Sequence, residues 1–210
     1  MNLRQFIKYW LWRDTTHRGE FDALRRLMTP DFPQLVVDIG ANDGFYGSNS
    51  FPFVARGWRG ILVEPHPVPF AQLEKLHRRR PNVTCHNVAC SNFTGTFPLF
   101  LGNDPSTSTL SHDPELLKTR TQNTIQVKVE TLSDLLNSLS IPADIGLLTV
   151  DSEGMDYEVL LGLDFSRWRP RLIITEDCKV KEAKKSEWLT SHGYRLVMPI
   201  AENTIWQSIR

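Results

Sequence analysis

The sequence predicts an α/β domain with a doubly wound, mostly parallel sheet that ends in an antiparallel hairpin. Short apolar segments alternate with helical patterns from residue 34 to residue 192, and strands joined through helices pair in parallel by right-handed crossovers. Most of these apolar segments end in a polar or acidic residue, as expected where the carboxyl ends of parallel strands share one sheet edge. The chain has 210 residues, 40% of them hydrophobic, which suffices for one core and is short for two.

The first 30 residues are predicted to form a helical segment ahead of the main domain, which spans residues 31–210. The apolar side chains of its first part recur at helical spacing: Leu3, Phe6, Ile7, Trp10 and Leu11. Basic residues lie off that stripe, so the helix is amphipathic. We expect it to pack on the domain; an active-site lid, a homo-oligomer contact and a membrane surface are the alternatives. A second helix is predicted for residues 22–28, ending before Pro30.

The first half of the domain is predicted to alternate between strand and helix. The strands are the apolar runs 34–38, 59–64 and 83–88. Helical patterns separate them at residues 46–56 and 67–79. Pro52 interrupts the first of these helices early. Two further strands, 96–101 and 124–129, flank a polar stretch at residues 102–123. A connection of that length in a compact domain is usually functional or mobile.

The second half repeats the alternation and closes with a hairpin. A helix is predicted for residues 131–139, because Thr131-Leu-Ser-Asp134 resembles a capping box with Asp in the place of Glu. The remaining strands are 145–150, 171–175, 193–198 and 203–208. The remaining helices are 155–163 and 181–192. The last two strands are joined through Pro199 and Asn203, which predicts an antiparallel pair.

Charge and cysteine content restrict the partners. The chain has 24 basic and 24 acidic residues and a pI near 7.0, so no overall field favours nucleic acid. Cys85, Cys90 and Cys178 form neither a disulfide framework nor CxxC pairs. His86 lies beside Cys85, but a fourth zinc ligand at suitable spacing is absent. With no apolar run long enough for a transmembrane segment and no signal peptide pattern, the expected location is the cytoplasm.

The most specific local pattern is the turn Asp38-Ile-Gly-Ala-Asn-Asp-Gly44 after the first strand, with Glu64 at the end of the second. Glycines allow close approach of a ligand, and a carboxylate at the next strand tip can accept both hydroxyls of a ribose. The GxGxxG pattern that holds a pyrophosphate is missing, since only two glycines remain. Asp38 and Asp43 would repel a pyrophosphate and favour a cationic ligand such as S-adenosylmethionine.

Taken together, the ordered segments resemble the S-adenosylmethionine-dependent methyltransferases and, within them, the FkbM family. The matching segments are 37–44, 63–65, 87–91, 127–134, 149–154 and 158–162. The resemblance implies a Rossmann-like class I methyltransferase fold and methyl transfer from S-adenosylmethionine to an oxygen, often a hydroxyl of a sugar or natural product. The acceptor would be a small molecule or a glycan. Asp134 follows Ser133 where a second acid is common, and Asp156 stands where the family often has Glu; both departures concern the substrate side.

The same resemblance implies the cofactor residues. The turn would contribute Asp38, Gly40, Asn42 and Gly44, the ribose acceptor would be Glu64, and the adenine side would be Asn87, Ala89 and Ser91. From the residues alone, the strand-tip position of Glu64 agrees with its role. Asn87 at a strand end is also a common turn residue, so both readings of it stay open.

Candidate catalytic residues are Asp151, Glu153 and His112. Methyl transfer to an alcohol needs an aligned acceptor oxygen and a group that takes its proton. Asp151 and Glu153 follow a buried strand on either side of Ser152, and either acid is a candidate general base; stabilisation of a helix N-terminus is the alternative. His112 lies in the polar stretch and is a candidate for substrate contact or proton transfer, with a plain exposed histidine as the alternative.

A second arrangement would add Mg²⁺. Asp151 after one strand and Glu176 with Asp177 after the next offer three oxygen ligands, a placement similar to that of magnesium-dependent catechol-type and some macrolide-sugar O-methyltransferases. Two other classes of function also stay open. One is a nicotinamide-dependent oxidoreductase or epimerase, which predicts a third turn glycine and a Tyr-x-x-x-Lys dyad that the chain lacks. The other is a non-catalytic partner subunit that retains the cofactor pocket.

Overall fold

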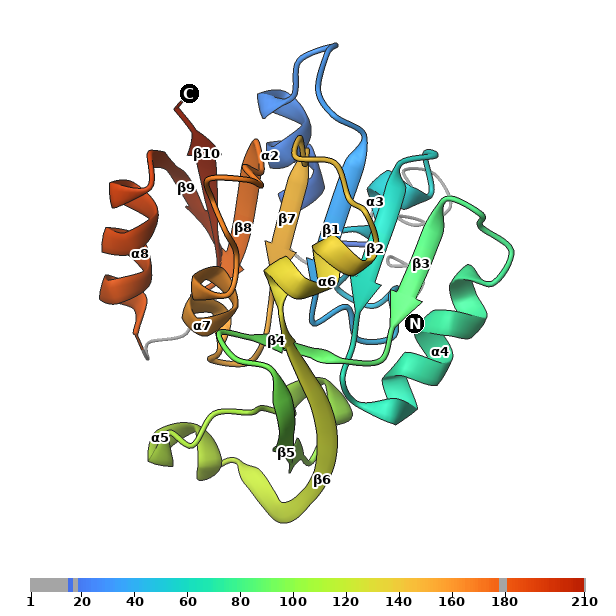
Figure 1. Cartoon of the computed structure of the whole chain (residues 1–210), viewed down its shortest axis with the longest axis vertical. Coiled ribbons are helices and arrows are strands. Elements are labelled where there is room, and N and C mark those ends of the chain that lie inside the picture. Colours follow the sequence, from blue (N-terminus) through green and yellow to red (C-terminus); the bar gives the residue numbers. More distant parts are fainter. Residues whose placement is uncertain (1–14, 17–18, 178–180, 210) are drawn as a thin grey trace.

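The computed structural model describes residues 15–16, 19–177 and 181–209, and a seven-stranded sheet in the order β3-β2-β1-β7-β8-β10-β9 forms its centre. The strands are β1 Leu35–Ile39, β2 Arg59–Val63, β3 Val83–His86, β7 Leu147–Val150, β8 Leu172–Glu176, β9 Tyr194–Ile200 and β10 Asn203–Ser208. The first five run parallel, and β10 is antiparallel to both β8 and β9. The predicted doubly wound sheet with an antiparallel terminal hairpin is confirmed (Figure 1).

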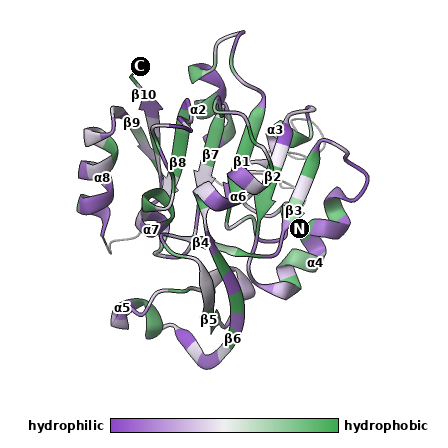
Figure 2. Ribbon diagram, viewed as in Figure 1, coloured by the Kyte–Doolittle hydropathy of each residue, from purple (hydrophilic) through white to green (hydrophobic). Residues whose placement is uncertain are grey.

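Helices cover both faces of this sheet. They are α2 Glu20–Leu27, α3 Phe51–Val54, α4 Pro67–His77, α6 Leu132–Ser138, α7 Asp156–Leu161 and α8 Glu182–Ser191. In β1, Val37 packs with residues of α6, α7 and α8, whereas Val36 packs with residues of α2 and α3. Because side chains alternate across a strand, these two groups of helices lie on opposite faces. Figure 2 shows the central strands as hydrophobic and much of α4 and α8 as hydrophilic.

A second, three-stranded sheet lies beside the carboxyl ends of the central strands (Figure 1). It consists of β4 Ala89–Ser91, β5 Gly95–Gly102 and β6 Arg120–Thr131, in the order β4-β6-β5. The predicted polar stretch 102–123 is partly ordered as a 3-10 turn, η1 (Pro105–Thr107), and a short helix, α5 (Pro114–Leu117). Strand β6 already begins at Arg120, so the connection is shorter than expected.

The helix predicted for residues 46–56 forms only over Phe51–Val54. Side chains upstream of it bond to the backbone: Asp43 Oδ1 accepts from the amides of Phe45 and Tyr46 at 2.8 and 2.9 Å. Ser48 Oγ accepts from the amide of Phe51 at 3.0 Å. Short polar side chains that bond locally in this way compete with helix hydrogen bonds. The residues between Asn42 and Ser50 therefore form a turn that stays close to the end of β1.

Other predicted elements agree with the structure within a few residues. The capping box before α6 is half formed: Thr131 Oγ1 accepts from the amide of Asp134 at 3.0 Å, while Asp134 Oδ2 accepts from Thr94 Oγ1 instead. Helix α2 packs through Phe21 and Leu24 on the central sheet. The amphipathic helix expected near the N-terminus and Cys178 lie outside the described residues.

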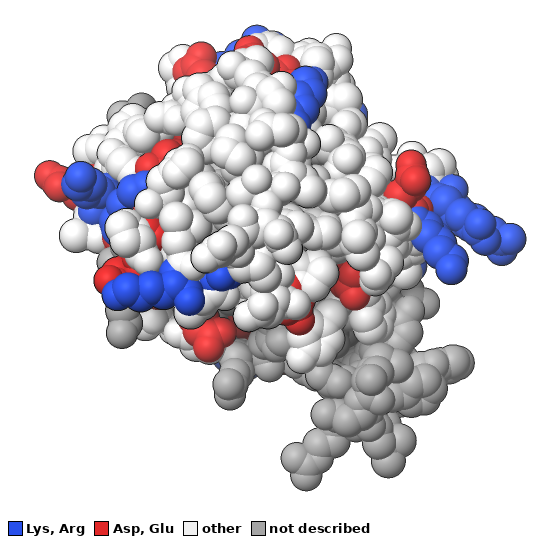
Figure 3. Space-filling model, turned by 90° about the horizontal axis from the view of Figure 1, so that it is seen from below, with Lys and Arg blue, Asp and Glu red and all other residues white. Residues whose placement is uncertain are grey.

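In the face seen from below, Lys and Arg side chains lie at the left, right and upper edges, and the middle is largely uncharged apart from a few Asp and Glu side chains in its lower part (Figure 3). None of the described helices has the length and apolar character needed to cross a bilayer.

Candidate active site

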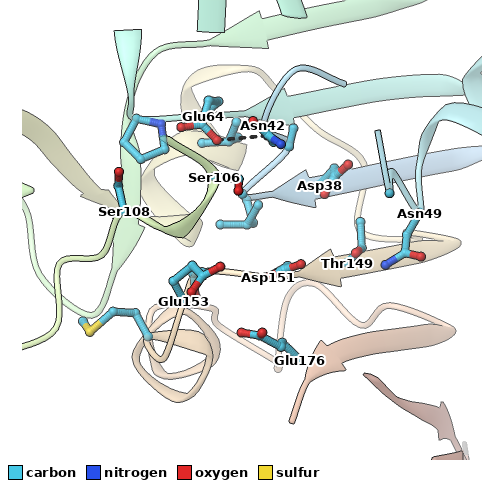
Figure 4. A pocket seen from close by; sticks show the side chains of 18 of the residues that line it. Asp38, Asn42, Asn49, Glu64, Ser106, Ser108, Thr149, Asp151, Glu153 and Glu176 are labelled. Carbon is cyan, nitrogen blue, oxygen red and sulfur yellow. Dashed lines mark hydrogen bonds between the residues drawn. The ribbon is translucent and has the colours of Figure 1, made fainter. Parts of the chain in front are cut away.

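The carboxyl ends of β1, β2, β7 and β8 surround a cavity of about 350 Å³. It lies where the strand order reverses, because β1 has β2 on one side and β7 on the other. Open α/β sheets bind ligands at such a switch point. The second sheet and its connection supply Leu99, Ser106 and Ser108 to the opposite wall, and the β9–β10 hairpin supplies Glu202 and Asn203. Figure 4 shows the polar side chains that line this cavity.

The turn after β1 is fixed by close backbone packing. The amides of Gly40 and Ala41 donate to the carbonyl of Val63 at 3.0 and 2.9 Å. Gly40 has φ +86°, and a Cβ added there would lie 1.7 Å from the carbonyl oxygen of Asp151. Only glycine combines this backbone conformation with this approach. The Gly40 position therefore holds the ends of β1, β2 and β7 together beneath the cavity.

Gly44, the second glycine of the predicted cofactor turn, has a different role. It also has a positive φ, +75°, but an added Cβ would meet Leu73 Cδ1 of α4 at 2.4 Å. Gly44 is absent from the cavity wall, whereas Asp38, Gly40 and Asn42 line it. The need for glycine at Gly44 thus comes from packing of the turn on α4.

Glu64 lies at the tip of β2 with its carboxylate held by the backbone. Its Oε2 accepts from the amide of Asn42 at 2.9 Å, and its Oε1 accepts from the amide of His66 at 2.7 Å. Burial raises the pKa of Glu64 to about 7, although the two amides favour the ionised form. Each carboxylate oxygen keeps lone-pair capacity for a further donor. Glu64 therefore presents an oriented acceptor to the cavity.

Asp38 and Asn49 lie together deeper in the cavity (Figure 4). Asp38 Oδ2 accepts from Ser50 Oγ at 2.5 Å. Burial raises the pKa of Asp38 to about 7, and the hydrogen bond from Ser50 opposes that shift. Asn49 is 8% exposed, and its Oδ1 has no hydrogen-bond partner among the described residues. Nothing in the sequence distinguishes Asn49, since Asn is a common residue in turns.

Of the three residues predicted for the adenine side, only Ala89 lies on the cavity wall. Ala89 lines the cavity together with its neighbours Val88 and Cys90. Asn87 instead donates from Nδ2 to the carbonyls of Glu64 and Pro65, at 2.9 and 3.0 Å, and so fixes the loop after β2. Ser91 is fully buried and absent from the cavity wall.

Three acids come together at the other end of the cavity. Oxygens of Asp151, Glu153 and Glu176 lie within 4.8 Å of one another, and Figure 4 shows the three side chains around one space. Asp151 is exposed to the cavity, but the protein packed around its carboxylate raises its pKa well above the usual range, and the charge of Glu176 adds to this effect. Burial and the neighbouring acids also raise the pKa of Glu176, to about 8.

Arg120, which no sequence pattern indicates, also contributes to the acid group. Its Nη2 lies 2.7 Å from Glu153 Oε2, and its side chain is 7% exposed. Burial raises the pKa of Glu153, while the charge of Arg120 opposes that shift. Thr109 Oγ1 also donates to the carbonyl of Glu153 at 2.7 Å. These two contacts attach the second sheet to the turn after β7. No sequence signal links Arg120 to a partner 33 residues away.

Asp156 is buried and joins the ends of β7 and β8. Its Oδ1 accepts from the amide and the hydroxyl of Ser152, at 2.9 and 2.6 Å. Its Oδ2 accepts from the amide of Glu176 at 2.9 Å. In the sequence, Asp156 differs from the family pattern, but nothing there indicates this role. The contacts hold Asp151 and Glu176 at a fixed spacing.

Of the three predicted magnesium ligands, Asp151 and Glu176 come together and Asp177 does not. Asp177 Oδ2 accepts from Thr204 Oγ1 at 2.5 Å, and its Oδ1 lies 3.8 Å from Lys185 Nζ. Within residues 15–16, 19–177 and 181–209, the acids close enough for one ion are Asp151, Glu153 and Glu176, without Asp177. Arg120 already pairs with Glu153 in that group. The set expected from the sequence, Asp151 with Glu176 and Asp177, is therefore not assembled.

His112 lies away from the acids. Its ring stands edge-on to Phe97 and Phe100, with centroid distances of 5.3 and 5.0 Å. The residue is exposed and does not line the cavity. In this structure it belongs to an aromatic cluster on the second sheet.

A doubly wound sheet with a glycine turn, an acid at the tip of β2 and a cavity at the switch point defines a Rossmann-like protein of the methyltransferase type. The sequence profile of the methyltransferase FkbM domain matches residues 38–196. The chain therefore belongs to the FkbM methyltransferase family.

Solved structures agree on the fold. The crystal structure of methyltransferase FkbM from Methylobacillus flagellatus KT is similar with a TM-score of 0.60 and 15% identity, over 93% of this chain and 49% of that one. The chain thus spans about half the length of that protein. A methyltransferase from Geobacter sulfurreducens has a TM-score of 0.51 and 14% identity, over 97% of this chain and 84% of that one. Among curated proteins, none matches the sequence significantly.

Proposed function

We propose that this protein is an S-adenosylmethionine-dependent O-methyltransferase that acts on a hydroxyl of a sugar, a glycan or a glycosylated metabolite. One observation carries the proposal. A single cavity joins the glycine turn after β1, the oriented carboxylate of Glu64 and the acid group around Asp151. Membership of the FkbM methyltransferase family supports the reaction type.

The residues at the β1 and β2 ends fit this methyl donor. Glu64 would accept the hydroxyls of its ribose, because two backbone amides already hold the carboxylate in one orientation. Ala89 and its neighbours on the wall would contact the adenine, with Asp38, Gly40 and Asn42 beneath the rest of the molecule. When bound, S-adenosylmethionine supplies a methyl group on a positively charged sulfur, which keeps the electron pair of the broken carbon–sulfur bond.

Asp151 is the proposed general base. It would take the proton of the acceptor hydroxyl as that oxygen forms its bond to the methyl carbon. Its raised pKa gives it a stronger affinity for this proton than an ordinary carboxylate has. Glu153 is engaged by Arg120 at 2.7 Å, so we assign it to shaping the acid group. His112 receives no step in the proposal, because it does not line the cavity.

Calorimetric titration of the folded protein with S-adenosylmethionine, S-adenosylhomocysteine and NAD tests the cofactor. We expect both sulfur compounds to bind and NAD not to bind. Binding of NAD alone would support the oxidoreductase or epimerase alternative, and absence of binding to both sulfur compounds would overturn the proposal. A mass-spectrometric screen of sugars and glycans for added methyl groups then separates an enzyme from a non-catalytic partner subunit.

The proposal contains no metal, since the predicted ligand set is not assembled and Arg120 engages Glu153. Methyl transfer should therefore persist at its full rate after treatment with a chelator and gel filtration into metal-free buffer. A loss of turnover that added magnesium restores would contradict this expectation and return Asp151 and Glu176 to the role of ligands.

A further inference from the structure

All the charged side chains on the cavity wall are acidic, and we propose that their negative charge selects the acceptor. The acceptor would carry a protonated amino group near the hydroxyl that is methylated, as amino sugars and aminocyclitols do. Phosphorylated and carboxylated acceptors would be disfavoured. This inference rests on the proposed methyl transfer and names its substrate class.

Acids dominate the cavity wall. Seven of its residues are acidic: Glu20, Asp38, Glu64, Asp151, Glu153, Glu176 and Glu202. None of the wall residues that the structure describes is Lys, Arg or His. Glu64 and Asp38 lie at the side proposed for the cofactor, and Asp151, Glu153 and Glu176 lie at the other (Figure 4).

The nearby cations leave two of these acids facing the cavity without an ion pair. Arg120 pairs with Glu153. Lys185 Nζ donates to the backbone carbonyl of Glu176 and pairs with Glu182 at 2.8 Å and with Asp177 at 3.8 Å. Its charge partly opposes the raised pKa of Glu176, but it forms no ion pair with that carboxylate. No ion pair within the described residues involves Asp151 or the Glu176 carboxylate. Like charges this close disfavour joint ionisation, which a cation between them would relieve.

Asn49 gives a second, independent indication of a donor-rich ligand. Its side chain is 8% exposed and lines the cavity beside Asp38 (Figure 4), and its Oδ1 has no hydrogen-bond partner in the part of the chain that the structure describes. Buried polar atoms in native proteins are normally satisfied, so this oxygen is arranged for a donor that enters with a ligand. An ammonium group brings three donors and no acceptor. A phosphate or carboxylate group would meet acceptors at both ends of the cavity.

The positive charge of the methyl donor alone does not neutralise the acids of the cavity wall. Its sulfonium and ammonium groups are positive and its carboxylate is negative, so it brings a single net positive charge. Asp151 and Glu176 surround the space left for the acceptor, and Glu202 lies on the adjacent hairpin. A second cation on the acceptor would complement these groups through charge-assisted hydrogen bonds.

A set of matched probes tests the inference on the full chain saturated with S-adenosylhomocysteine. The probes are glucosamine, N-acetylglucosamine, glucose and glucose 6-phosphate, with dissociation constants from ligand-observed NMR. We expect glucosamine to bind about tenfold more tightly than glucose, because the ammonium adds charge-assisted hydrogen bonds. N-acetylglucosamine should lose this advantage, and glucose 6-phosphate should bind more weakly than glucose.

Single substitutions test which acids cause the preference for glucosamine over glucose. Glu176→Gln and, separately, Asp151→Asn should each reduce the preference for glucosamine over glucose to about threefold or less. Glu187→Gln, which removes the same charge from an exposed site on α8, should leave it unchanged. Equal binding of glucosamine and glucose, or no binding of any probe, would overturn the inference. Binding of S-adenosylhomocysteine is measured first, so its failure overturns the proposed function, whereas its success with indifferent probes overturns only the acceptor class.

Discussion

At the scale of single residues, substitutions of Glu64 and Asp151 should distinguish cofactor binding from the chemical step. Glu64→Gln keeps the size of the side chain and removes its charge, so the affinity for S-adenosylhomocysteine should fall by about tenfold or more, as charge-assisted hydrogen bonds are lost. Asp151→Asn should leave that affinity nearly unchanged and reduce kcat by about 100-fold or more, since proton removal contributes on this order. Calorimetry and a methyl-transfer assay measure the two effects. Unchanged turnover in Asp151→Asn would remove its role as base.

Gly40 supports a prediction about stability. Gly40→Ala places a methyl group against the Asp151 carbonyl, 1.7 Å away, at a φ of +86°. Gly57→Ala is the matched control, because Gly57 has φ +95° and nothing within 4 Å of the added Cβ. The control should lose about 1 kcal/mol of unfolding free energy through backbone strain alone. Gly40→Ala should lose clearly more in denaturant titrations; equal losses would show that the turn relaxes without cost.

Asp38 links stability to pH. Burial raises its pKa in the folded protein to about 7, above the ordinary value of 3.8, so the folded protein binds this proton more tightly than the unfolded chain does. The contribution of Asp38 to stability is therefore greatest at low pH and is lost as the pH rises from about 4 to about 7. Asp38→Asn removes this titration and keeps an acceptor for Ser50. The difference in melting temperature between variant and wild type should grow in favour of the variant over that pH range; a constant difference would contradict the shift.

At the scale of elements, the attachment of the second sheet to the turn after β7 is the feature to test. Arg120→Met removes the charged contact to Glu153, which is 2.7 Å long and nearly buried. We expect slower methyl transfer and faster amide hydrogen exchange in β5 and β6, because local opening follows the loss of such contacts. Lys128→Met on the same strand is the control, since that side chain is 64% exposed. Equal exchange in both variants would show that the contact does not hold the sheet.

Elements differed in how far the sequence could predict them. Apolar runs such as 145–150 identify central strands, because those strands are buried on both faces. The helix expected at residues 46–56 forms only over Phe51–Val54, because Asp43 and Ser48 accept hydrogen bonds from backbone amides. The spacing of apolar residues does not reveal such bonds. Strand β4 has three residues, too few for a periodic pattern. Its pairing with β6 is a long-range event that local sequence does not encode.

At the scale of the whole molecule, the sheet order follows from the alternation of strands and helices, and the order places the candidate site. Strand tips therefore predicted Glu64, Asp151 and Glu176 as neighbours of one cavity. Sequence reasoning failed where side chains meet across elements. Arg120 reaches Glu153, Asp156 joins two strand ends, and Asp177 turns toward Lys185 and Thr204. Such pairings depend on three-dimensional placement of segments that carry no shared pattern.

The contact between Asn203 and Glu20 has a consequence for the order of events during synthesis. Asn203 Nδ2 donates to Glu20 Oε1 at 3.2 Å across 183 residues of sequence, and both residues line the cavity. This part of the wall cannot form until β10 has left the ribosome and docked beside β8. A nascent chain that already contains Glu64 and Asp151 would still lack it. The cavity wall is therefore completed by one of the last pairings of the sheet, although most of its acids come from strands made much earlier.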